Sequence, residues 1–474
     1  MEKNFKNQSI SSVRWSLIDK GGSQLVLLVN ILIMGRLLNP KDYGLVGMLY
    51  IFVTIAGLFI DSGMGAALIR KQNATKTDSN TIFYFNILVS LFFYVVIFLL
   101  APFVSQFYEE PQLTNLLRVL GLNLIITSLG QVHAVILRKE LKVRKITRSN
   151  LIGLFISTIV GVICAYNGLA VWSLIIPNLL QSVIAVCLLW QFSGWRPDLE
   201  FSMKSLKEFY KFGLGLLMSS IVEQIFNNLY QPFIGKMFSA SYTGFYYQAK
   251  RLNEVPIATL SSVVNSISFP ILVKYQDNIA ELKTTYEKII KLLIFVTLPI
   301  VILINILAHP LVFIVMGEKW LFSADLLQIL SLAGIFMVLE NINRNLLKLE
   351  GKTILIFKLE LVKKAIVVLT ILATYKFGIK ALMYGIVFNS IVSFCLNQYF
   401  TVIRITDYRK IFLILLNGIF MVLPTLLVAH YSKNPYVTLF FGALAGLTTY
   451  LLVGYFLKIK EQQWAFSILS NKFK

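Results

Sequence analysis

The sequence predicts an all-α integral membrane protein of about 14 transmembrane helices, arranged as two six-helix lobes in parallel repeat plus two C-terminal helices. The first observation is composition: 57% of the 474 residues are hydrophobic, 14% are charged, and the mean hydropathy is +0.73. A soluble protein of this length could not bury that much apolar surface. The second observation is an alternation of positive charge between loops, and the third is a repeated decapeptide.

Fourteen segments contain the run of about 20 mostly apolar residues that a bilayer-spanning helix needs. In order, they cover residues 14–37, 43–66, 81–106, 113–136, 149–167, 170–192, 211–236, 246–271, 287–308, 322–346, 356–375, 379–402, 411–430 and 436–457. The first, eighth and tenth segments depart most from a plain apolar span in our reading, because they carry charges and amides. All loops between the segments are short, so none could form a separate catalytic domain.

The positive charges support this count and predict the topology. With the N-terminus inside, most of the 44 lysines and arginines fall in the inside loops, as is typical of cytoplasmic loops. A missed helix would disturb this alternation in every later loop. We therefore expect both termini to be cytoplasmic. The net charge of +21 is then mainly topological and does not indicate a nucleic-acid partner.

A decapeptide occurs twice, at corresponding positions. Residues 35–44 read GRLLNPKDYG and residues 235–244 read GKMFSASYTG. Six predicted helices separate the copies, and because six is even, both copies have the same orientation across the membrane. We therefore expect an N-terminal lobe at 1–200, a C-terminal lobe at 201–402, and two further helices with a cytoplasmic tail at 403–474. The alternative is a recurrent Gly-bounded hairpin without common ancestry.

Duplicated lobes are typical of a secondary transporter, in which substrate binds between the lobes and their rocking alternates access. The Walker A motif G-x-x-x-x-G-K-[ST] of ATP-driven pumps does not occur in the sequence. The three cysteines lie inside apolar runs, without metal-ligand spacing. We therefore expect a transporter rather than an enzyme, with no cofactor and no metal site.

Ionisable residues inside the predicted spans are the candidates for a substrate cavity, because a charge facing lipid is costly. Lys20 follows Asp19 in the first span and precedes two glycines that loosen the helix, so Lys20 could line a cavity while Asp19 pairs elsewhere. Alternatively, this span starts later and both charges lie at the cytoplasmic interface. Asp61 lies nine residues before Arg70, about 13 Å along a helix. We expect Asp61 to face the cavity, with a buried structural pair as the alternative.

The seventh span carries a polar stripe. Glu223, Asn227 and Gln231 occur at i, i+4 and i+8, so they share one face of a helix. Lipid cannot solvate this face, which predicts that it lines an interior. Pro232 then interrupts the helical hydrogen bonds.

The eighth and tenth spans add further charges. Lys250 and Arg251 could form either an outer rim or the mouth of the cavity. Glu340 and Arg344 are spaced i, i+4, which is the favourable order for an ion pair. This pair could line the cavity or be a self-neutralised structural pair near the cytoplasmic interface.

The eleventh span holds Glu360, Lys363 and Lys364 near its cytoplasmic end. These side chains could reach the interface by snorkelling, or they could contribute to the interior. Because several of the interior candidates are bases, the cavity is suited to an anionic substrate such as phosphate or pyrophosphate.

Three stretches of the chain resemble a known family. They are FIDSGMGAALIRK, the corner GKMFSASYTGFYYQAKRLNEVP, and its earlier copy GRLLNPKDYG. The chain is similar to the Wzx-like polysaccharide flippases of the multidrug/oligosaccharidyl-lipid/polysaccharide exporter superfamily. The resemblance extends over nearly the whole chain.

The resemblance implies an inner-membrane flippase for undecaprenyl-pyrophosphate-linked oligosaccharides in lipopolysaccharide, O-antigen or capsule biosynthesis. It also implies alternating access, contact with membrane lipid, and partners such as a polysaccharide polymerase and the chain-length machinery. The family's cationic cavity matches Lys20, and it matches Glu223, Lys250, Arg251 and Arg344 on later spans.

One position departs from the family pattern. Many relatives carry an aspartate near Tyr230, where this chain has Asn228, Tyr230 and Gln231. An acidic coupling group is therefore not expected there. The alternatives are a multidrug exporter of the same superfamily, which needs a predominantly acidic cavity, and a lipid II flippase. A membrane-embedded glycan polymerase is a further alternative, but it usually needs a large external loop.

Overall fold

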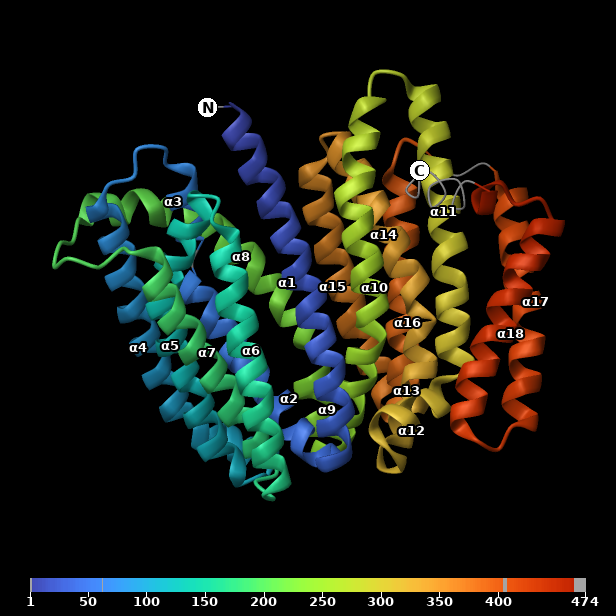
Figure 1. Cartoon of the computed structure of the whole chain (residues 1–474), viewed down its shortest axis with the longest axis horizontal. Helices are drawn as coiled ribbons and strands as arrows, with labels where there is room; N and C mark the ends of the chain where they lie inside the picture. Colours follow the sequence, from blue (N-terminus) through green and yellow to red (C-terminus); the bar gives the residue numbers. More distant parts are fainter. Residues whose placement is uncertain (1, 62, 404–406, 464–474) are drawn as a thin grey trace. The chain divides into compact units, whose positions relative to one another are not determined.

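A computed structural model describes residues 2–61, 63–403 and 407–463, with some side chains inside the helices left out. The described residues form helices and their connections, and no strand occurs among them. The chain divides into two compact units, Met1–Gly244 and Phe245–Lys474 (Figure 1). The boundary between the units falls at the end of the second copy of the repeated decapeptide. The lobes proposed from the repeat, 1–200 and 201–402, remain a prediction.

The helices of the first unit are long and closely follow one another. They are α1 (Glu2–Leu37), α2 (Pro40–Asp61), α3 (Met64–Arg70), α4 (Lys76–Tyr108), α5 (Gln112–Lys139), α6 (Val143–Tyr166), α7 (Trp172–Ser193), α8 (Met203–Asn228) and α9 (Tyr230–Met237). Helix α10 (Ala240–Lys274) starts at the end of this unit and continues into the second. The remaining helices are α11 (Ile279–Ile306), α12 (Ala308–Met316), α13 (Leu321–Ser331), α14 (Ala333–Leu349), α15 (Thr353–Thr374), α16 (Ile379–Phe400), α17 (Tyr408–Tyr431) and α18 (Pro435–Phe456), with short 3-10 turns at Glu318–Trp320 and Tyr375–Phe377.

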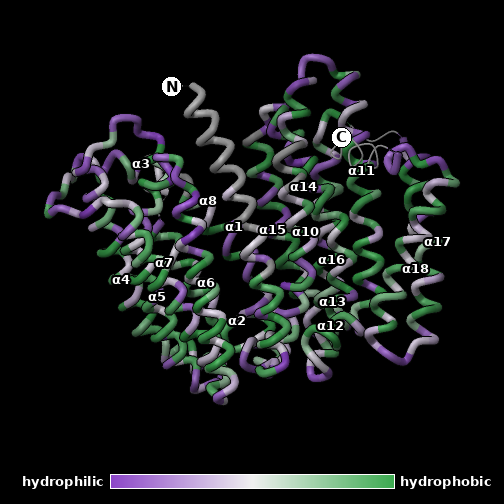
Figure 2. Tube along the Cα trace, in the orientation of Figure 1, coloured by the Kyte–Doolittle hydropathy of each residue, from purple (hydrophilic) through white to green (hydrophobic). Residues whose placement is uncertain are grey.

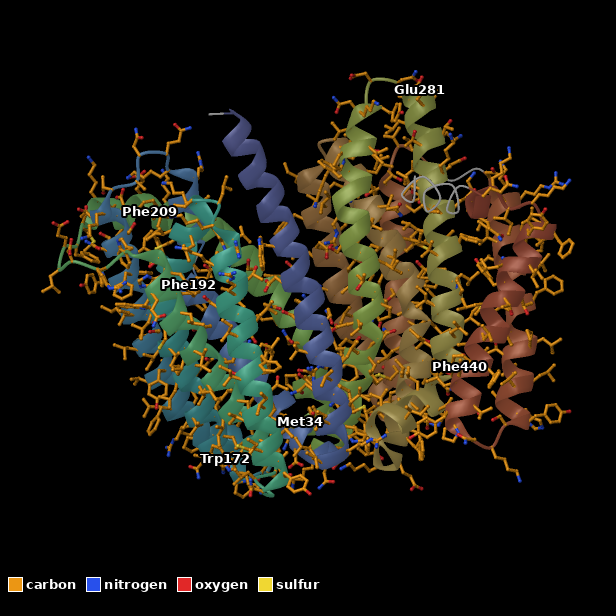
Figure 3. The ribbon with its side chains drawn as sticks, in the orientation of Figure 1. Met34, Trp172, Phe192, Phe209, Glu281 and Phe440 are labelled. Carbon is orange, nitrogen blue, oxygen red and sulfur yellow. The ribbon has the colours of Figure 1, made fainter. Side chains whose placement is uncertain are left out.

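The apolar character of these helices is that of a membrane protein. Within the described residues, ten helical stretches are long and apolar enough to cross a membrane. Hydrophobic residues occupy the middle of the helices, and hydrophilic residues gather at their ends (Figure 2). Large apolar side chains point away from the ribbon, such as Phe440 on α18, which is 65% exposed (Figure 3). Within the described residues, each predicted span coincides mainly with helix, which confirms the all-helical class, while the count of 14 spans remains a prediction.

Each unit has its own apolar core. In the first unit, Leu49 and Ile60 of α2 pack in one buried cluster with Leu117 of α5 and Ile175 of α7. In the second unit, a buried cluster joins α11, α14, α17 and α18, and Tyr450 of α18 donates a hydrogen bond to the backbone oxygen of Phe295 at 2.8 Å. These clusters hold the helices that carry the polar groups described below.

The second predicted span is interrupted rather than continuous. Helix α2 ends at Asp61, and Gly63 adopts a left-handed conformation with φ of 67° before α3 begins. Glycine reaches this region without the steric penalty of a Cβ atom. Asp61 therefore lies at the end of a helix and not within one.

The seventh predicted span is also divided. Helix α8 begins at Met203, where the N-cap Ser202 accepts a hydrogen bond from the backbone N–H of Ser205. The helix ends at Asn228 and α9 starts at Tyr230. Pro232 explains this break, because its ring removes the hydrogen bond to the carbonyl of residue 228 and crowds that carbonyl.

The two copies of the decapeptide contact each other within the first unit. A Cβ atom built on Gly44 would lie 1.7 Å from the carbonyl oxygen of Ala240, and one built on Gly244 would lie 1.8 Å from that of Pro40. Pro40 and Ala240 occupy the same position of the repeat and begin α2 and α10. A reciprocal contact of this kind is expected of two copies related by an approximate twofold rotation. The second glycine of each copy permits this close approach of two backbones.

Candidate substrate site

A cluster of four charged side chains joins two helices of the second unit. Glu340 and Arg344 lie on α14, and Glu360 and Lys363 lie on α15. The Lys363 ammonium contacts Glu340 Oε1 at 2.7 Å and Glu360 Oε1 at 3.0 Å. Arg344 contacts the same two oxygens at 3.4 Å each. The cluster contains two acids and two bases, so its charge is balanced.

Lys363 is the centre of this cluster, and its side chain is only 6% exposed. Helix α16 adds Asn397, whose amide donates to Glu340 Oε1 at 3.3 Å. A buried ammonium is tolerated only where carboxylates and hydrogen bonds replace its hydration. Of the two alternatives for Lys363, the structure therefore supports the interior and not snorkelling to the interface. The i, i+4 pair of Glu340 and Arg344 is present, as its spacing predicted.

Arg344 also lines a pocket of about 260 Å³. Its other lining residues are Phe269 of α10 and Asn341, Asn345 and Lys348 of α14. The Arg344 side chain is 35% exposed. Its Nε atom is buried and has no hydrogen-bond partner among the described residues. The guanidinium therefore keeps unused donor capacity beside an open pocket.

Two amides of the pocket are held in place by α10. Asn341 donates to Ser261 Oγ at 3.1 Å, and Asn345 donates to Ser268 Oγ at 3.3 Å. Side-chain hydrogen bonds of this kind fix the rotamers of a binding site before a ligand arrives. The pocket thus combines two bases with two oriented amides, a set of groups that suits an oxyanion.

Lys348 was not among the predicted site residues, because it was counted with the cytoplasmic loop. The signal was present in its spacing. Asn341, Arg344, Asn345 and Lys348 are at i, i+3, i+4 and i+7, which places them on one face of a helix. Asn343 lies on a different face, is fully buried, and accepts a hydrogen bond from Tyr286 at 2.5 Å.

The other predicted residues of the second unit lie outside this pocket. Lys250 and Glu254 form an ion pair at 3.7 Å along α10, and Glu254 is exposed. Arg251 is half-buried on the same helix. Neither base is part of the pocket lining. The choice between a rim and a cavity mouth for these two bases stays open.

The polar stripe of the seventh span is split by the structure. Glu223 and Asn227 are exposed on α8, whereas Gln231 is buried on α9. The break at Leu229 separates Gln231 from the other two side chains. Asn228 instead donates to the Gln224 carbonyl at 3.0 Å and to its side-chain oxygen at 3.3 Å. The structure therefore places the three residues on two helices with different exposure, and their common polar face stays a prediction.

The first two predicted charges belong to the first unit. Asp61 is exposed at the end of α2, and the Arg138 guanidinium of α5 acts electrostatically on it. Lys20 lies on α1, but its side chain is outside what the structure describes. Helix α1 continues through Gly21 and Gly22, so the two glycines do not interrupt it.

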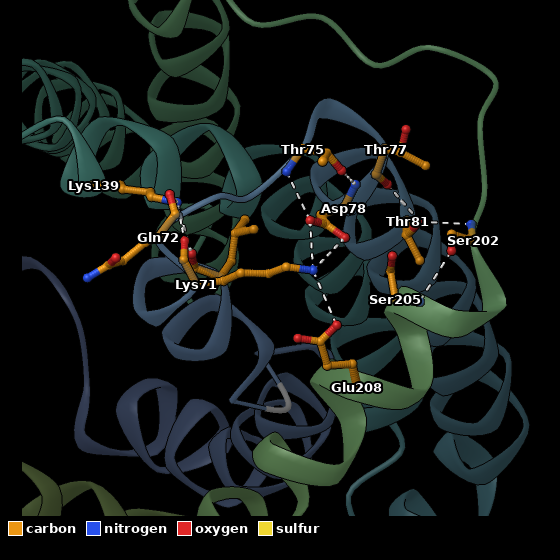
Figure 4. A network of polar contacts seen from close by, with 11 residues as sticks. Lys71, Gln72, Thr75, Thr77, Asp78, Thr81, Lys139, Ser202, Ser205 and Glu208 are labelled. Atoms are coloured by element: carbon orange, nitrogen blue, oxygen red, sulfur yellow. Dashed lines mark hydrogen bonds and ion pairs between the residues drawn. The ribbon is translucent and has the colours of Figure 1, made fainter.

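A second polar network ties together four helices of the first unit (Figure 4). Lys71 contacts Asp78 Oδ2 at 3.1 Å and Glu208 Oε2 at 3.2 Å. Lys139 donates to the Lys71 carbonyl at 2.5 Å, close to the end of α3. Burial lowers the pKa of Lys71, but its hydrogen bonds to Asp78 and Glu208 outweigh this and raise the pKa above its usual value. Lys71 therefore stays charged at neutral pH and joins α3, α4 and α8.

We expect Lys71→Ala to destabilise this end of the first unit by about 2 kcal/mol, because Asp78 stays buried without its cation. Lys41→Ala is the control, since Lys41 pairs with Glu110 at 2.8 Å but is 49% exposed. An exposed pair contributes less than about 1 kcal/mol. Unfolding of both variants by denaturant in detergent micelles, followed by circular dichroism, measures the difference. Equal losses would contradict a special role for the Lys71 network.

Helices long and apolar enough to cross a membrane, with ionisable side chains gathered inside, indicate a multi-pass membrane protein. The model of the polysaccharide biosynthesis protein family matches residues 33–325. The chain therefore belongs to the polysaccharide biosynthesis protein family. This confirms the predicted resemblance to Wzx-like proteins.

Two relatives are similar over most of their length. The teichuronic acid biosynthesis protein TuaB of Bacillus subtilis (strain 168) is 25% identical over 352 residues, covering 74% of this chain and 73% of TuaB. The lipopolysaccharide biosynthesis protein WzxC of Escherichia coli (strain K12) is 23% identical over 435 residues, covering 90% of this chain and 88% of WzxC.

Solved structures share the fold. The lipid II flippase MurJ, in an inward closed conformation, matches with a TM-score of 0.76 at 16% identity, over 94% of this chain and 99% of MurJ. An inward-facing multidrug resistance transporter of the MATE family matches with a TM-score of 0.52 at 15% identity, over 93% of this chain and 95% of that chain. At these identities the likeness concerns the fold alone, which is that of the exporter superfamily.

Proposed function

We propose that this protein is a flippase that moves undecaprenyl-pyrophosphate-linked oligosaccharide repeat units across the inner membrane for surface polysaccharide biosynthesis. The family and the biosynthetic names of TuaB and WzxC support a role in polysaccharide export. The observation that carries the proposal is the pocket on α14, where Arg344 and Lys348 offer cations to a pyrophosphate. An exporter of organic cations needs acids in that position instead.

The ion cluster holds Arg344 less tightly than Lys363, so Arg344 is the base that can turn toward an anion. Lys363 makes the shorter contacts to Glu340 and Glu360, at 2.7 and 3.0 Å, while those of Arg344 are 3.4 Å. When the guanidinium turns toward a phosphate, both carboxylates keep the Lys363 ammonium. Lys348, Asn341 and Asn345 then supply further donors to the same headgroup.

The proposed cycle is alternating access between two six-helix lobes, 1–200 and 201–402, with the 403–474 region outside the repeat. The headgroup enters from the cytoplasm, where both termini lie, and leaves on the periplasmic side after the lobes rock. The glycine contact between the two decapeptides is the natural pivot, because it brings equivalent positions of the repeat together. A polysaccharide polymerase and the chain-length machinery then act on the released repeat unit. The protein itself makes and breaks no covalent bond in this scheme.

The proposal is tested by transport in proteoliposomes, with a fluorescent undecaprenyl-pyrophosphate oligosaccharide placed in one leaflet. We expect Arg344→Ala and Lys348→Ala each to slow its movement about tenfold, since each removes a charge-assisted hydrogen bond. Lys348 is exposed, so its removal leaves the ion cluster intact. Lys358→Ala, an exposed base on α15, is the matched control and should transport normally.

Three outcomes would overturn the assignment. Export of an organic cation without movement of the glycan lipid would indicate a multidrug exporter. Movement of lipid II alone would indicate a lipid II flippase. Normal transport by both Arg344→Ala and Lys348→Ala would remove the α14 pocket from the mechanism.

A further inference from the structure

The first unit contains an apolar slot of about 220 Å³ between α2, α4 and α8. We call it the aromatic slot. Its lining includes Phe59 of α2, Phe85, Phe92 and Phe93 of α4, and Tyr210 and Leu217 of α8. Phe92 is 60% exposed, so the slot opens on the outer surface of the unit.

The walls of the slot are built from contacting rings. Phe59 and Phe93 stack with centroids 4.7 Å apart, and Phe92 meets Phe93 edge-on at 5.4 Å. Phe85 meets Tyr210 at 6.5 Å across the α4–α8 junction. Such ring pairs stabilise the positions of the side chains by more than their buried area alone would provide.

Helix α8 is anchored next to the slot, so the slot does not depend on a mobile element. Phe209 is 2% exposed and packs in a core cluster with Phe83 of α4. Glu208 is bound to Lys71. These two contacts fix the orientation of the neighbouring Tyr210. An apolar site of this kind suits hydrocarbon better than water.

Three lysines flank Tyr210 along α8, the helix that forms one wall of the slot. Lys204, Lys207 and Lys211 are all exposed on the first turns of α8. Lys207 lies one turn before both Tyr210 and Lys211. The acid in this stretch, Glu208, is already paired with Lys71. The N-terminal end of the helix adds its own preference for an anion.

We infer that the aromatic slot binds the part of the polyprenyl chain next to the phosphate, with the phosphate held by the α8 lysines, in a binding step separate from that of the headgroup at Arg344 and Lys348. An anionic amphiphile has a hydrocarbon chain and a negatively charged group. The aromatic slot is complementary to the chain, and the α8 lysines are complementary to the charged group. The choice of the polyprenyl-linked substrate over an ordinary anionic lipid rests on the proposed function.

The test is photolabelling in nanodiscs of phosphatidylcholine, with undecaprenyl phosphate that carries a diazirine on its chain. Adducts are mapped by mass spectrometry of peptides. We expect labelling to concentrate on residues 85–93 and 210–217. Phe92→Ala should lower the labelling yield about fivefold, because the bound chain loses its apolar contact with the Phe92 ring. Phe155→Ala on α6 is the matched control, since Phe155 is also 60% exposed but does not line the slot.

A separate experiment tests whether the α8 lysines bind the phosphate. The triple variant Lys204→Gln, Lys207→Gln, Lys211→Gln should lower labelling by undecaprenyl phosphate but not by undecaprenol carrying the same diazirine. Unlabelled undecaprenyl diphosphate should compete, whereas an equal amount of phosphatidylglycerol should not. Labelling spread evenly over the lipid-facing helices, or equal competition by phosphatidylglycerol, would overturn the inference.

Parallel transport measurements separate this inference from the proposed function. If wild type moves the glycan lipid, and Phe92→Ala binds and moves it equally well, the slot is rejected and the flippase assignment stands. If wild type labels at the slot but moves no glycan lipid, the slot stands as a polyprenyl site and the flippase assignment is rejected.

Discussion

Replacing Gly44 with alanine is expected to destabilise the protein by about 3 kcal/mol or more. The added methyl group would lie 1.7 Å from the Ala240 carbonyl oxygen. This neighbour is backbone at the start of α10, so no side-chain rotation can relieve the clash. The two helix starts must separate instead. Gly244→Ala should have a similar effect, because its methyl group would lie 1.8 Å from the Pro40 carbonyl oxygen.

The control is Gly57→Ala on the same helix as Gly44. A Cβ at Gly57 meets no atom within 4 Å. Alanine is favoured over glycine in a helix by about 1 kcal/mol, so this variant should be neutral or more stable. Unfolding free energies from denaturant titrations in mixed micelles give the comparison. A Gly44→Ala variant as stable as Gly57→Ala would contradict the close contact.

The double variant tests whether the two glycines belong to one contact. Once Gly44→Ala has separated α2 from α10, the methyl group of Gly244→Ala meets a gap that is already open. The double variant should therefore cost clearly less than the sum of the single variants. Additive costs would indicate that the two clashes are relieved independently.

The sequence predicted the helical class because membrane helices must satisfy every backbone polar group internally, which leaves a strong hydropathy signal. It also indicated that the decapeptide is a recurring corner. It could not indicate that the two corners touch, because that contact depends on how α2 and α10 approach in space. Glycine at 44 and 244 is compatible with a turn, a helix start or a close approach.

Contacts in the site could be predicted from the sequence only where both residues lie on the same helix. The spacing of Glu340 and Arg344 was enough to predict their pair. For Lys363, the distance from the helix end alone left both the interface and the interior open. Its actual environment comes from Glu340 and Asn397 on two other helices. A sequence without its tertiary contacts carries no such information.

The second large effect is expected from Lys363→Met. This substitution leaves Glu340 and Glu360 side by side, with Arg344 at 3.4 Å from each as their remaining ion-pair partner. Removing one partner from a buried ion cluster costs about 3–5 kcal/mol, because an uncompensated charge remains in a medium of low polarity. We expect a loss of this size in the same micelle titrations.

A second substitution separates charge from packing. In Lys363→Met with Glu360→Gln, Glu340 and Arg344 remain as a balanced pair, so about half of the lost stability should return. Lys358→Met is the control on the same helix, since Lys358 is exposed and should change stability by less than about 0.5 kcal/mol. If the double variant is no more stable than Lys363→Met alone, Lys363 stabilises the protein by the packing of its side chain and not by its charge. The firmer hold of Lys363 on both carboxylates would then no longer explain how Arg344 becomes available to a phosphate.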